Sequence, residues 1–156
     1  MLRVFITGYG IVSAFGKSWN EFRNALLKKQ NAVIYMQEWE KYKQLTTYLA
    51  APILDYKHPK EWSRKELRSL GRVSQYSVEA AGLALRMAGL FNDSSIKDGR
   101  MGVASGSSTG STDAILELAK LMFAGEGDCN ANSYIKSMPH TTAANIAIFY
   151  GLKGRM

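Results

Sequence analysis

Two short runs of β-branched and aromatic residues predict strands. Residues 2–8 (LRVFITG) lead into a glycine-rich turn, and residues 101–105 (MGVAS) lead into a turn of small residues. Residues 31–61 have no clean period and contain Pro52 and Pro59, so we expect an irregular excursion with at most short strands around TTYLAAPIL. Helical patterns surround these runs, which indicates an α/β domain with few strands. Two strands alone are short of a sheet, because parallel strands are normally flanked by others.

Two of the predicted helices begin with a capping box, in which a serine and a glutamate three residues later bond to each other's backbone N–H groups. Ser18 with Glu21 opens the first helix. Ser63 with Glu66 opens the strongest helix, which ends at Gly89. Alanine and glycine crowd the second half of that helix, so we expect it to be buried on more than one side.

Two further helices follow the second strand. Thr112 or Asp113 can cap the helix AILELAKLMFAG, and residues 140–150 form another apolar helix that stops at Gly151. The segment between them, around Cys129, reads as a surface loop.

Composition indicates one globular domain covering residues 1–156, with no second domain, because 46% of the residues are apolar. No apolar run approaches the roughly 18 residues of a membrane span. The amino terminus enters a strand-like run instead of a signal sequence. We therefore expect a soluble cytoplasmic protein without membrane contact.

The residue types that carry chemistry are sparse. Cys129 is the only cysteine, so disulfides within the chain and metal sites built on paired cysteines are excluded. His58 and His140 have no acid or thiol beside them in sequence, which favours structural roles. We identify no set of nucleophile, base and orienting residue, and no metal site.

Two glycine-rich stretches are candidates for cofactor binding. In ITGYGIVSAFG, Gly8 and Gly10 are followed by Ser13 where a dinucleotide-binding motif has its third glycine. SGSSTGSTD has no lysine to reach a phosphate, so close packing of its backbone against another segment or a ligand is the better interpretation. We therefore expect no cofactor.

The net charge is +7, and much of the excess lies in residues 57–72. Such a density can attract nucleic acid, an anionic membrane or an acidic protein, and it can also be a solvated helix face. Nucleic acid is the weakest of these interpretations, because the interleaved aromatic residues of a binding groove are absent from this run.

Four stretches resemble one family. VFITGYGIVSAFG, WSRKELRSLGRVSQYSVEAAGLALRMAGL, MGVASGSSTGSTDAI and SMPHTTAANIAIFYGLKGR are similar, in the same order, to segments of the β-ketoacyl-(acyl carrier protein) synthases. The resemblance implies an incomplete thiolase-like fold, made of the first strands and helices of its amino-terminal half. It also implies an oligomer, homomeric or heteromeric, or a companion chain that carries the rest of the fold.

The resemblance implies carrier-protein docking by a basic helix. Arg64, Lys65 and Arg68 match basic positions that face the acidic acyl carrier protein in relatives. Ser69 stands where relatives often have a further basic residue, and the loop GDCNANS lacks a basic pair that relatives can carry. Docking is therefore expected to be weaker or differently placed.

A second set of residues is expected to line the acyl pocket. Thr109 falls in the turn where relatives place a side chain in the acyl tunnel, and Tyr134, Ile135 and Met138 belong to the segment lining the same region. Gly71 replaces a frequent acidic residue, so local polar contacts are expected to differ.

Members of this family carry out decarboxylative Claisen condensation, in which a malonyl-carrier thioester loses CO₂ and attacks an acyl group held on a cysteine. In the family that cysteine follows the strand after LKGR, whereas this sequence stops five residues after Gly151. We therefore expect a fragment or split half of a synthase of fatty acid, polyene or polyketide biosynthesis, inactive alone. The alternative is a non-catalytic partner or a module that binds acyl carrier protein.

Overall fold

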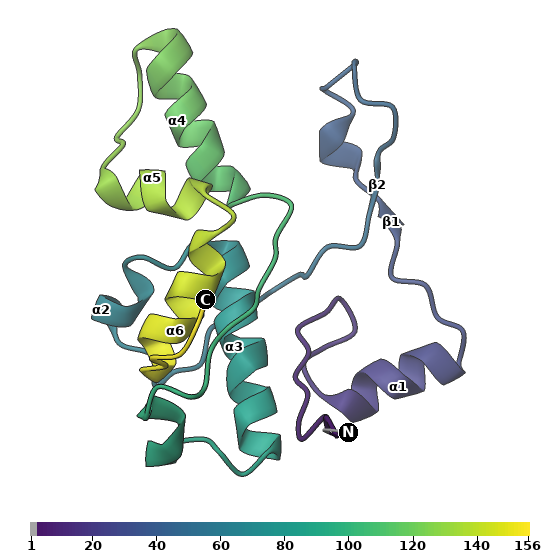
Figure 1. Cartoon of the computed structure of the whole chain (residues 1–156). Helices are drawn as coiled ribbons and strands as arrows, with labels where there is room; N and C mark the ends of the chain where they lie inside the picture. Colours follow the sequence, from purple (N-terminus) through teal and green to yellow (C-terminus); the bar gives the residue numbers. More distant parts are fainter. Residues whose placement is uncertain (1–2) are drawn as a thin grey trace. The chain divides into compact units, whose positions relative to one another are not determined.

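The computed structural model describes residues 3–156, which separate into two compact units (Figure 1). The larger unit joins the amino-terminal segment up to Tyr9 to His58–Met156, and the smaller unit spans Gly10–Lys57. None of the helices within the described residues is both long and apolar enough to span a membrane.

The smaller unit holds one helix and one short strand pair. Helix α1 (Trp19–Leu27) begins with the predicted capping box: the Ser18 hydroxyl accepts the Glu21 N–H, and the Glu21 carboxylate accepts the Ser18 N–H, both at 3.2 Å. Strands β1 (Ile34–Tyr35) and β2 (Leu49–Ala50) pair antiparallel around the 3₁₀ turn η1 (Gln37–Trp39). The short strand expected near TTYLAAPIL is thus confirmed.

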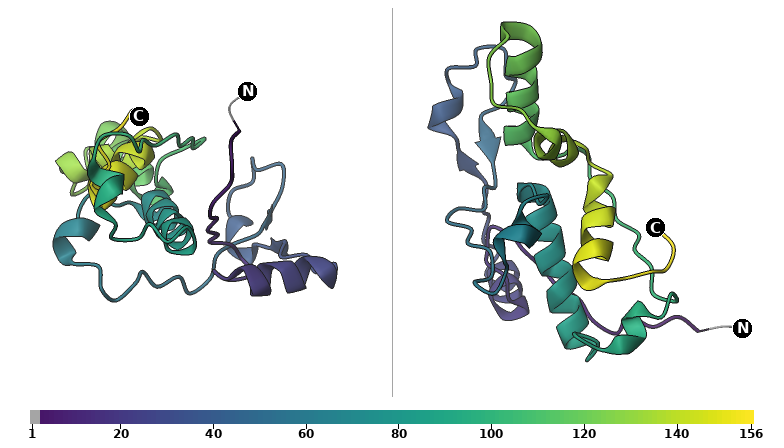
Figure 2. Two further views of the ribbon diagram at one scale, coloured as in Figure 1. Left: turned by 60° about the horizontal axis from the view of Figure 1, so that its bottom comes forward. Right: turned by 90° about the vertical axis from the view of Figure 1, so that its left-hand side faces the viewer.

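The larger unit is built from helices. In chain order these are α2 (Arg64–Leu67), α3 (Arg72–Met87), the 3₁₀ turn η2 (Ser94–Lys97), α4 (Thr112–Ala124), α5 (Ala131–Ser137) and α6 (Thr141–Tyr150). Helices α3 and α6 lie side by side, and so do α4 and α5 (Figures 1 and 2).

The prediction of one continuous helix from Ser63 to Gly89 is wrong in its middle. The chain leaves helical geometry at Gly71, whose φ of −72° and ψ of 172° are extended. A Cβ at Gly71 would overlap the Ser111 hydroxyl, so glycine lets the start of α3 lie against the start of α4. The two ends of the prediction are confirmed, because Ser63 and Glu66 form a capping box and Gly89 follows α3 with φ of 71°.

The core of the larger unit forms where α3 packs on α6. Its buried members are Trp62, Leu70, Val78 and Ile146. The hydroxyl of Tyr150, at the end of α6, donates to the Val78 carbonyl in α3 at 2.7 Å. The small residues expected in α3 allow this close approach, because a Cβ at Gly82 would overlap the Tyr150 hydroxyl.

Of the two predicted strands, residues 3–8 and 101–105 are not strands, and residue 2 lies outside the described residues. Val4, Phe5 and Ile6 are 94%, 73% and 91% exposed. The second segment begins a pairing, since the Val103 N–H donates to the Arg155 carbonyl and the Gly154 N–H to the Met101 carbonyl, both at 2.9 Å. A β-rich sequence becomes a strand only beside partners, and two or three short segments do not complete a ladder.

The ends of α4 and α5 differ from the predictions. Ser111, not Thr112 or Asp113, is the N-cap of α4, and its hydroxyl accepts the Val73 N–H from α3 at 3.4 Å. Helix α5 was not predicted. It begins at a capping box in which Asn130 and Ser133 replace the usual serine and glutamate, so the sequence signal was weak.

Candidate functional site

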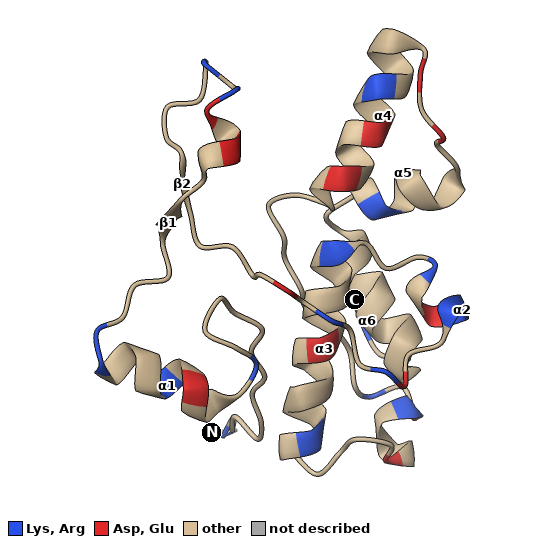
Figure 3. Ribbon diagram, turned by 180° about the vertical axis from the view of Figure 1, so that it is seen from behind, with Lys and Arg blue, Asp and Glu red and all other residues tan. Residues whose placement is uncertain are grey.

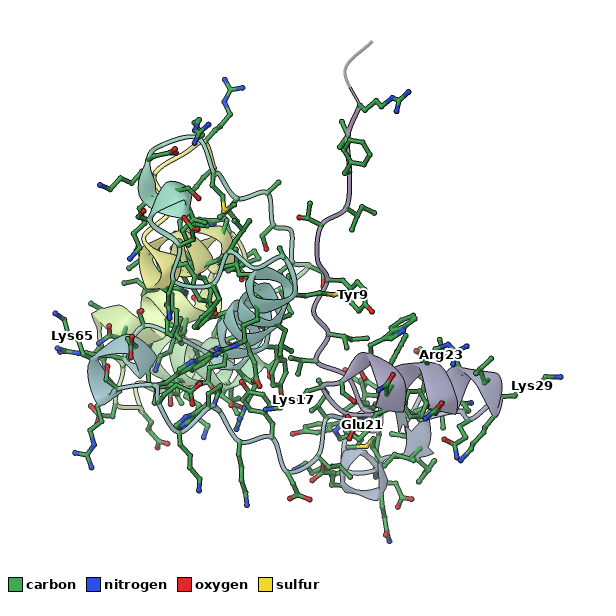
Figure 4. The ribbon with its side chains drawn as sticks, turned by 90° about the horizontal axis from the view of Figure 1, so that it is seen from below. Tyr9, Lys17, Glu21, Arg23, Lys29 and Lys65 are labelled. Carbon is green, nitrogen blue, oxygen red and sulfur yellow. The ribbon has the colours of Figure 1, made fainter. Side chains whose placement is uncertain are left out.

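Helix α2 presents the predicted basic surface. Arg64, Lys65 and Arg68 are all exposed, the first two in α2 and the third as its C-cap (Figure 3). The side chain of Lys65 extends outward from the helix (Figure 4). The structure therefore places these three cations together on one short element.

A capping box holds this short helix. The Glu66 carboxylate accepts from the N–H and the hydroxyl of Ser63, both at 2.7 Å, and the Ser63 hydroxyl accepts the Glu66 N–H at 3.3 Å. These hydrogen bonds from Ser63 hold the pKa of Glu66 below its ordinary value. Glu66 therefore stays ionised but is turned toward the helix start, which leaves the basic side chains to face solvent.

A polar chain connects the end of this surface to α6. The Ser69 hydroxyl donates to Asn145 Oδ1 at 3.4 Å, and Asn145 Nδ2 donates to the Ser74 hydroxyl at 3.0 Å. Asn145 and Ser74 are both buried. Ser69, which stands where relatives often have a basic residue, thus ties the segment between α2 and α3 to α6, a role that sequence reasoning missed.

The turn before α4 lies against the end of α5. A Cβ at Gly110 would overlap the backbone carbonyl of Ser137, and the Ser111 N–H donates to the Lys136 carbonyl at 2.9 Å. The Ser133 hydroxyl adds a bond to the Glu117 carboxylate at 3.1 Å, which fixes α5 to α4. The expectation that SGSSTGSTD packs its backbone closely against another segment is confirmed.

The predicted pocket residues lie on the two segments that make this contact. Thr109 is exposed in the turn next to Gly110, and Met138 is half-buried at the C-cap of α5. Tyr134 and Ile135, on α5, are 57% and 37% exposed. Backbone contacts therefore hold the turn and α5 together, while the four predicted pocket side chains remain at least partly accessible to solvent.

The cysteine and the histidines occupy ordinary structural surroundings. Cys129 is partly buried in the loop before α5. The His58 ring stacks on Trp62 with centroids 6.2 Å apart, and its Nδ1 lies 2.9 Å from the Pro59 carbonyl oxygen. His140 is exposed at the N-cap of α6, as predicted. Within residues 3–156 no group of three or more His, Cys, Asp and Glu side chains is placed to hold a metal ion.

Comparison with known proteins identifies the family. Residues 1–156 match the profile of the β-ketoacyl synthase amino-terminal domain. The chain is 26% identical over 154 residues to the 3-oxoacyl-[acyl-carrier-protein] synthase 2 of Vibrio harveyi. The aligned region covers 97% of this chain and 36% of that protein.

Solved structures agree with this assignment. A β-ketoacyl synthase from Burkholderia phymatum STM815 superimposes with a TM-score of 0.92 and 49% identity, over 99% of this chain and 38% of that one. The ishigamide ketosynthase/chain length factor shares the fold, with a TM-score of 0.75 and 20% identity over 96% of this chain and 38% of its own. The chain thus spans less than two fifths of these relatives, and its helices and few strands form part of their thiolase-like α/β fold. It belongs to the β-ketoacyl synthase family, whose amino-terminal domain its residues 1–156 match.

Proposed function

We propose that residues 1–156 form the amino-terminal part of one ketosynthase domain. The whole enzyme would join an acyl thioester to a malonyl-carrier thioester by decarboxylative Claisen condensation, in fatty acid, polyene or polyketide biosynthesis. The observation that carries this proposal is the match of all 156 residues to the family profile, supported by the 49% identity to a β-ketoacyl synthase of known structure.

In this proposal α2 docks the carrier protein. The exposed cations cluster on this element: Arg64, Lys65 and Arg68. The acidic residue of α2, Glu66, accepts hydrogen bonds from Ser63. An acidic partner would therefore meet three available cations, which accelerates association and makes the affinity depend on salt.

The turn and α5 form one wall of the acyl pocket in the same proposal. Thr109 is exposed in the turn, and Tyr134, Ile135 and Met138 come from α5 and its C-cap. The backbone contact between Gly110 and Ser137 fixes the spacing between these two parts of the wall.

We expect no condensation from these 156 residues alone. The reaction needs an activated thiolate, and Cys129, in the loop before α5, stands in none of the four stretches that resemble the family. The measurement is release of labelled CO₂ from malonyl-carrier protein, with and without a companion chain that supplies the remaining family segments.

The outcomes separate the two candidate functions. Activity that appears only with the companion chain, and that survives Cys129→Ala, supports the ketosynthase proposal. Carrier binding without activity in any such mixture would instead establish a non-catalytic, carrier-binding partner. Condensation by the chain alone, lost in Cys129→Ala, would contradict the expectation about its thiol.

A further inference from the structure

A cleft of about 340 Å³ lies between α2 and α6, directly beside the basic surface. Its apolar lining comes from Leu70, Phe149 and Ile148, and Lys65 stands at its rim. Leu70 is 3% exposed and belongs to the core, whereas Ile148 is 79% exposed on the solvent side of α6. The cleft therefore has a buried floor and an apolar edge that the described residues leave open.

Apart from Lys65, the polar side chains that line this cleft already have partners. Asn145 is held between Ser69 and Ser74, and the hydroxyl of Ser63 and the carboxylate of Glu66 bind each other. A partner can therefore cover the cleft without leaving a buried donor or acceptor unsatisfied, which removes the main penalty for burying polar groups. What the cleft offers is apolar contact.

The charges around the cleft set the kind of partner that fits. Lys65 is on its rim, and Arg64 and Arg68 lie on the same helix and its C-cap. The two nearby acids are engaged, Glu66 with Ser63 and Glu61 with Arg86 at 3.5 Å. A complementary surface has an apolar side chain in its centre and carboxylates one helical turn away on the same face, which is the pattern of an acidic amphipathic helix.

We propose that the α2–α6 cleft anchors an apolar side chain of an acidic helix of the acyl carrier protein, with Ile148 as the main contact, while Lys65 and Arg68 pair with its carboxylates. This inference rests on the proposed function, and it adds apolar contact to the electrostatic docking proposed there. Ser69 contributes to this geometry, because its hydroxyl donates to Asn145 and both residues line the cleft.

The test measures binding of apo acyl carrier protein to the 156-residue chain by fluorescence anisotropy across a range of salt concentrations. Ile148→Ser should weaken binding about tenfold and leave the salt dependence unchanged, because it removes apolar contact only. Ile148→Leu should bind like the unaltered chain. Lys65→Glu should weaken binding mainly at low salt and flatten the salt dependence, because exposed charges are screened.

Met122→Ser is the matched control, since Met122 is 75% exposed on α4 and the change removes a similar apolar side chain. Circular dichroism of each variant checks that the helices are retained. Equal affinity of Ile148→Ser and Met122→Ser would overturn the cleft assignment while leaving carrier docking intact. No carrier binding by the unaltered chain would instead contradict the docking part of the proposed function. Ile148-dependent binding to phosphatidylglycerol vesicles but not to the carrier would assign the cleft to a membrane and overturn the proposal.

Discussion

Glycine positions decide how closely the segments of this chain approach one another. Gly110 and Gly106 lie four residues apart in the same turn, and neither has a positive φ. A Cβ at Gly110 would overlap the Ser137 carbonyl, whereas a Cβ at Gly106 would meet nothing within 4 Å. The two positions look alike in sequence, and only the packing of α5 separates them.

Gly110→Ala is therefore expected to destabilise the chain by about 1–3 kcal/mol, because the new methyl group displaces the end of α5. Gly106→Ala is the control, and its effect should be within about 1 kcal/mol of zero or slightly stabilising, because alanine restricts the unfolded chain. Urea denaturation monitored by circular dichroism measures both. Equal midpoints for the two variants would show that the contact between Gly110 and Ser137 does not constrain the fold.

At the scale of elements, a half-buried phenol joins α3 and α6 by a hydrogen bond. Burial raises the pKa of Tyr150 to about 12 from its ordinary 10.0, and the neutral hydroxyl donates to the Val78 carbonyl at 2.7 Å. Because the folded state favours the neutral form, the contribution of this group to stability is complete below pH 10 and is lost as pH rises toward about 12. The interhelical contact is thus insensitive to pH in the neutral range.

The Tyr150→Phe variant should therefore lose less stability than the unaltered chain between pH 10 and pH 12, the interval between the two pKa values. The difference between their thermal unfolding midpoints, measured through this interval, reports Tyr150 alone, because every other tyrosine and lysine is common to both proteins. A constant difference across the interval would contradict the raised pKa.

Gly82 and Tyr150 are expected to be coupled. Gly82→Ala should destabilise the unaltered chain by about 1–2 kcal/mol, because the added Cβ displaces the Tyr150 hydroxyl from its acceptor. In the Tyr150→Phe background the same change should be neutral or stabilising, because alanine favours a helix over glycine by about 1 kcal/mol. A double-mutant cycle of unfolding free energies measures the coupling. Additive effects would mean that the helices adjust freely.

At the scale of the whole molecule, the amino-terminal segment exposes β-forming side chains that have no partner strand in the described residues. Val4 and Ile6 are 94% and 91% exposed, and alternate positions of an extended segment lie on one face. Such a segment is a template for pairing with another chain. We expect the isolated chain to self-associate through it.

Replacing both Val4 and Ile6 by lysine should lower the apparent mass in sedimentation velocity at high concentration, because edge lysines oppose strand pairing. The matched control replaces Met122 and Phe123 by lysine, which adds the same charge to the exposed apolar residues of α4. If both double variants dissociate equally, the association is non-specific adhesion of apolar surface. A monomeric unaltered chain with full hydrogen-exchange protection would contradict the expectation altogether.

Four helix boundaries, the starts of α1 and α2 and the ends of α3 and α6, followed from the sequence because their causes are local. Ser18 and Ser63 bond to glutamates three residues away, and Gly89 and Gly151 take the positive φ that ends α3 and α6. The family also followed from the sequence, because four stretches kept the order typical of β-ketoacyl synthases, and the profile match over residues 1–156 confirmed it.

Tertiary structure alone decided the features that depend on residues far apart in the chain. The 63–89 helix is divided because Ser111 packs on Gly71. The predicted strands did not form within the described residues, because a ladder requires neighbouring strands. The three cations of α2 could be read from the sequence, but Ile148 could not be singled out, because its exposure beside Lys65 results from how α6 packs on α3. Local hydrogen bonds and glycine conformations determine the helix ends at Ser18, Ser63, Gly89 and Gly151, whereas packing between distant segments determines where the 63–89 helix is divided and which surfaces remain open.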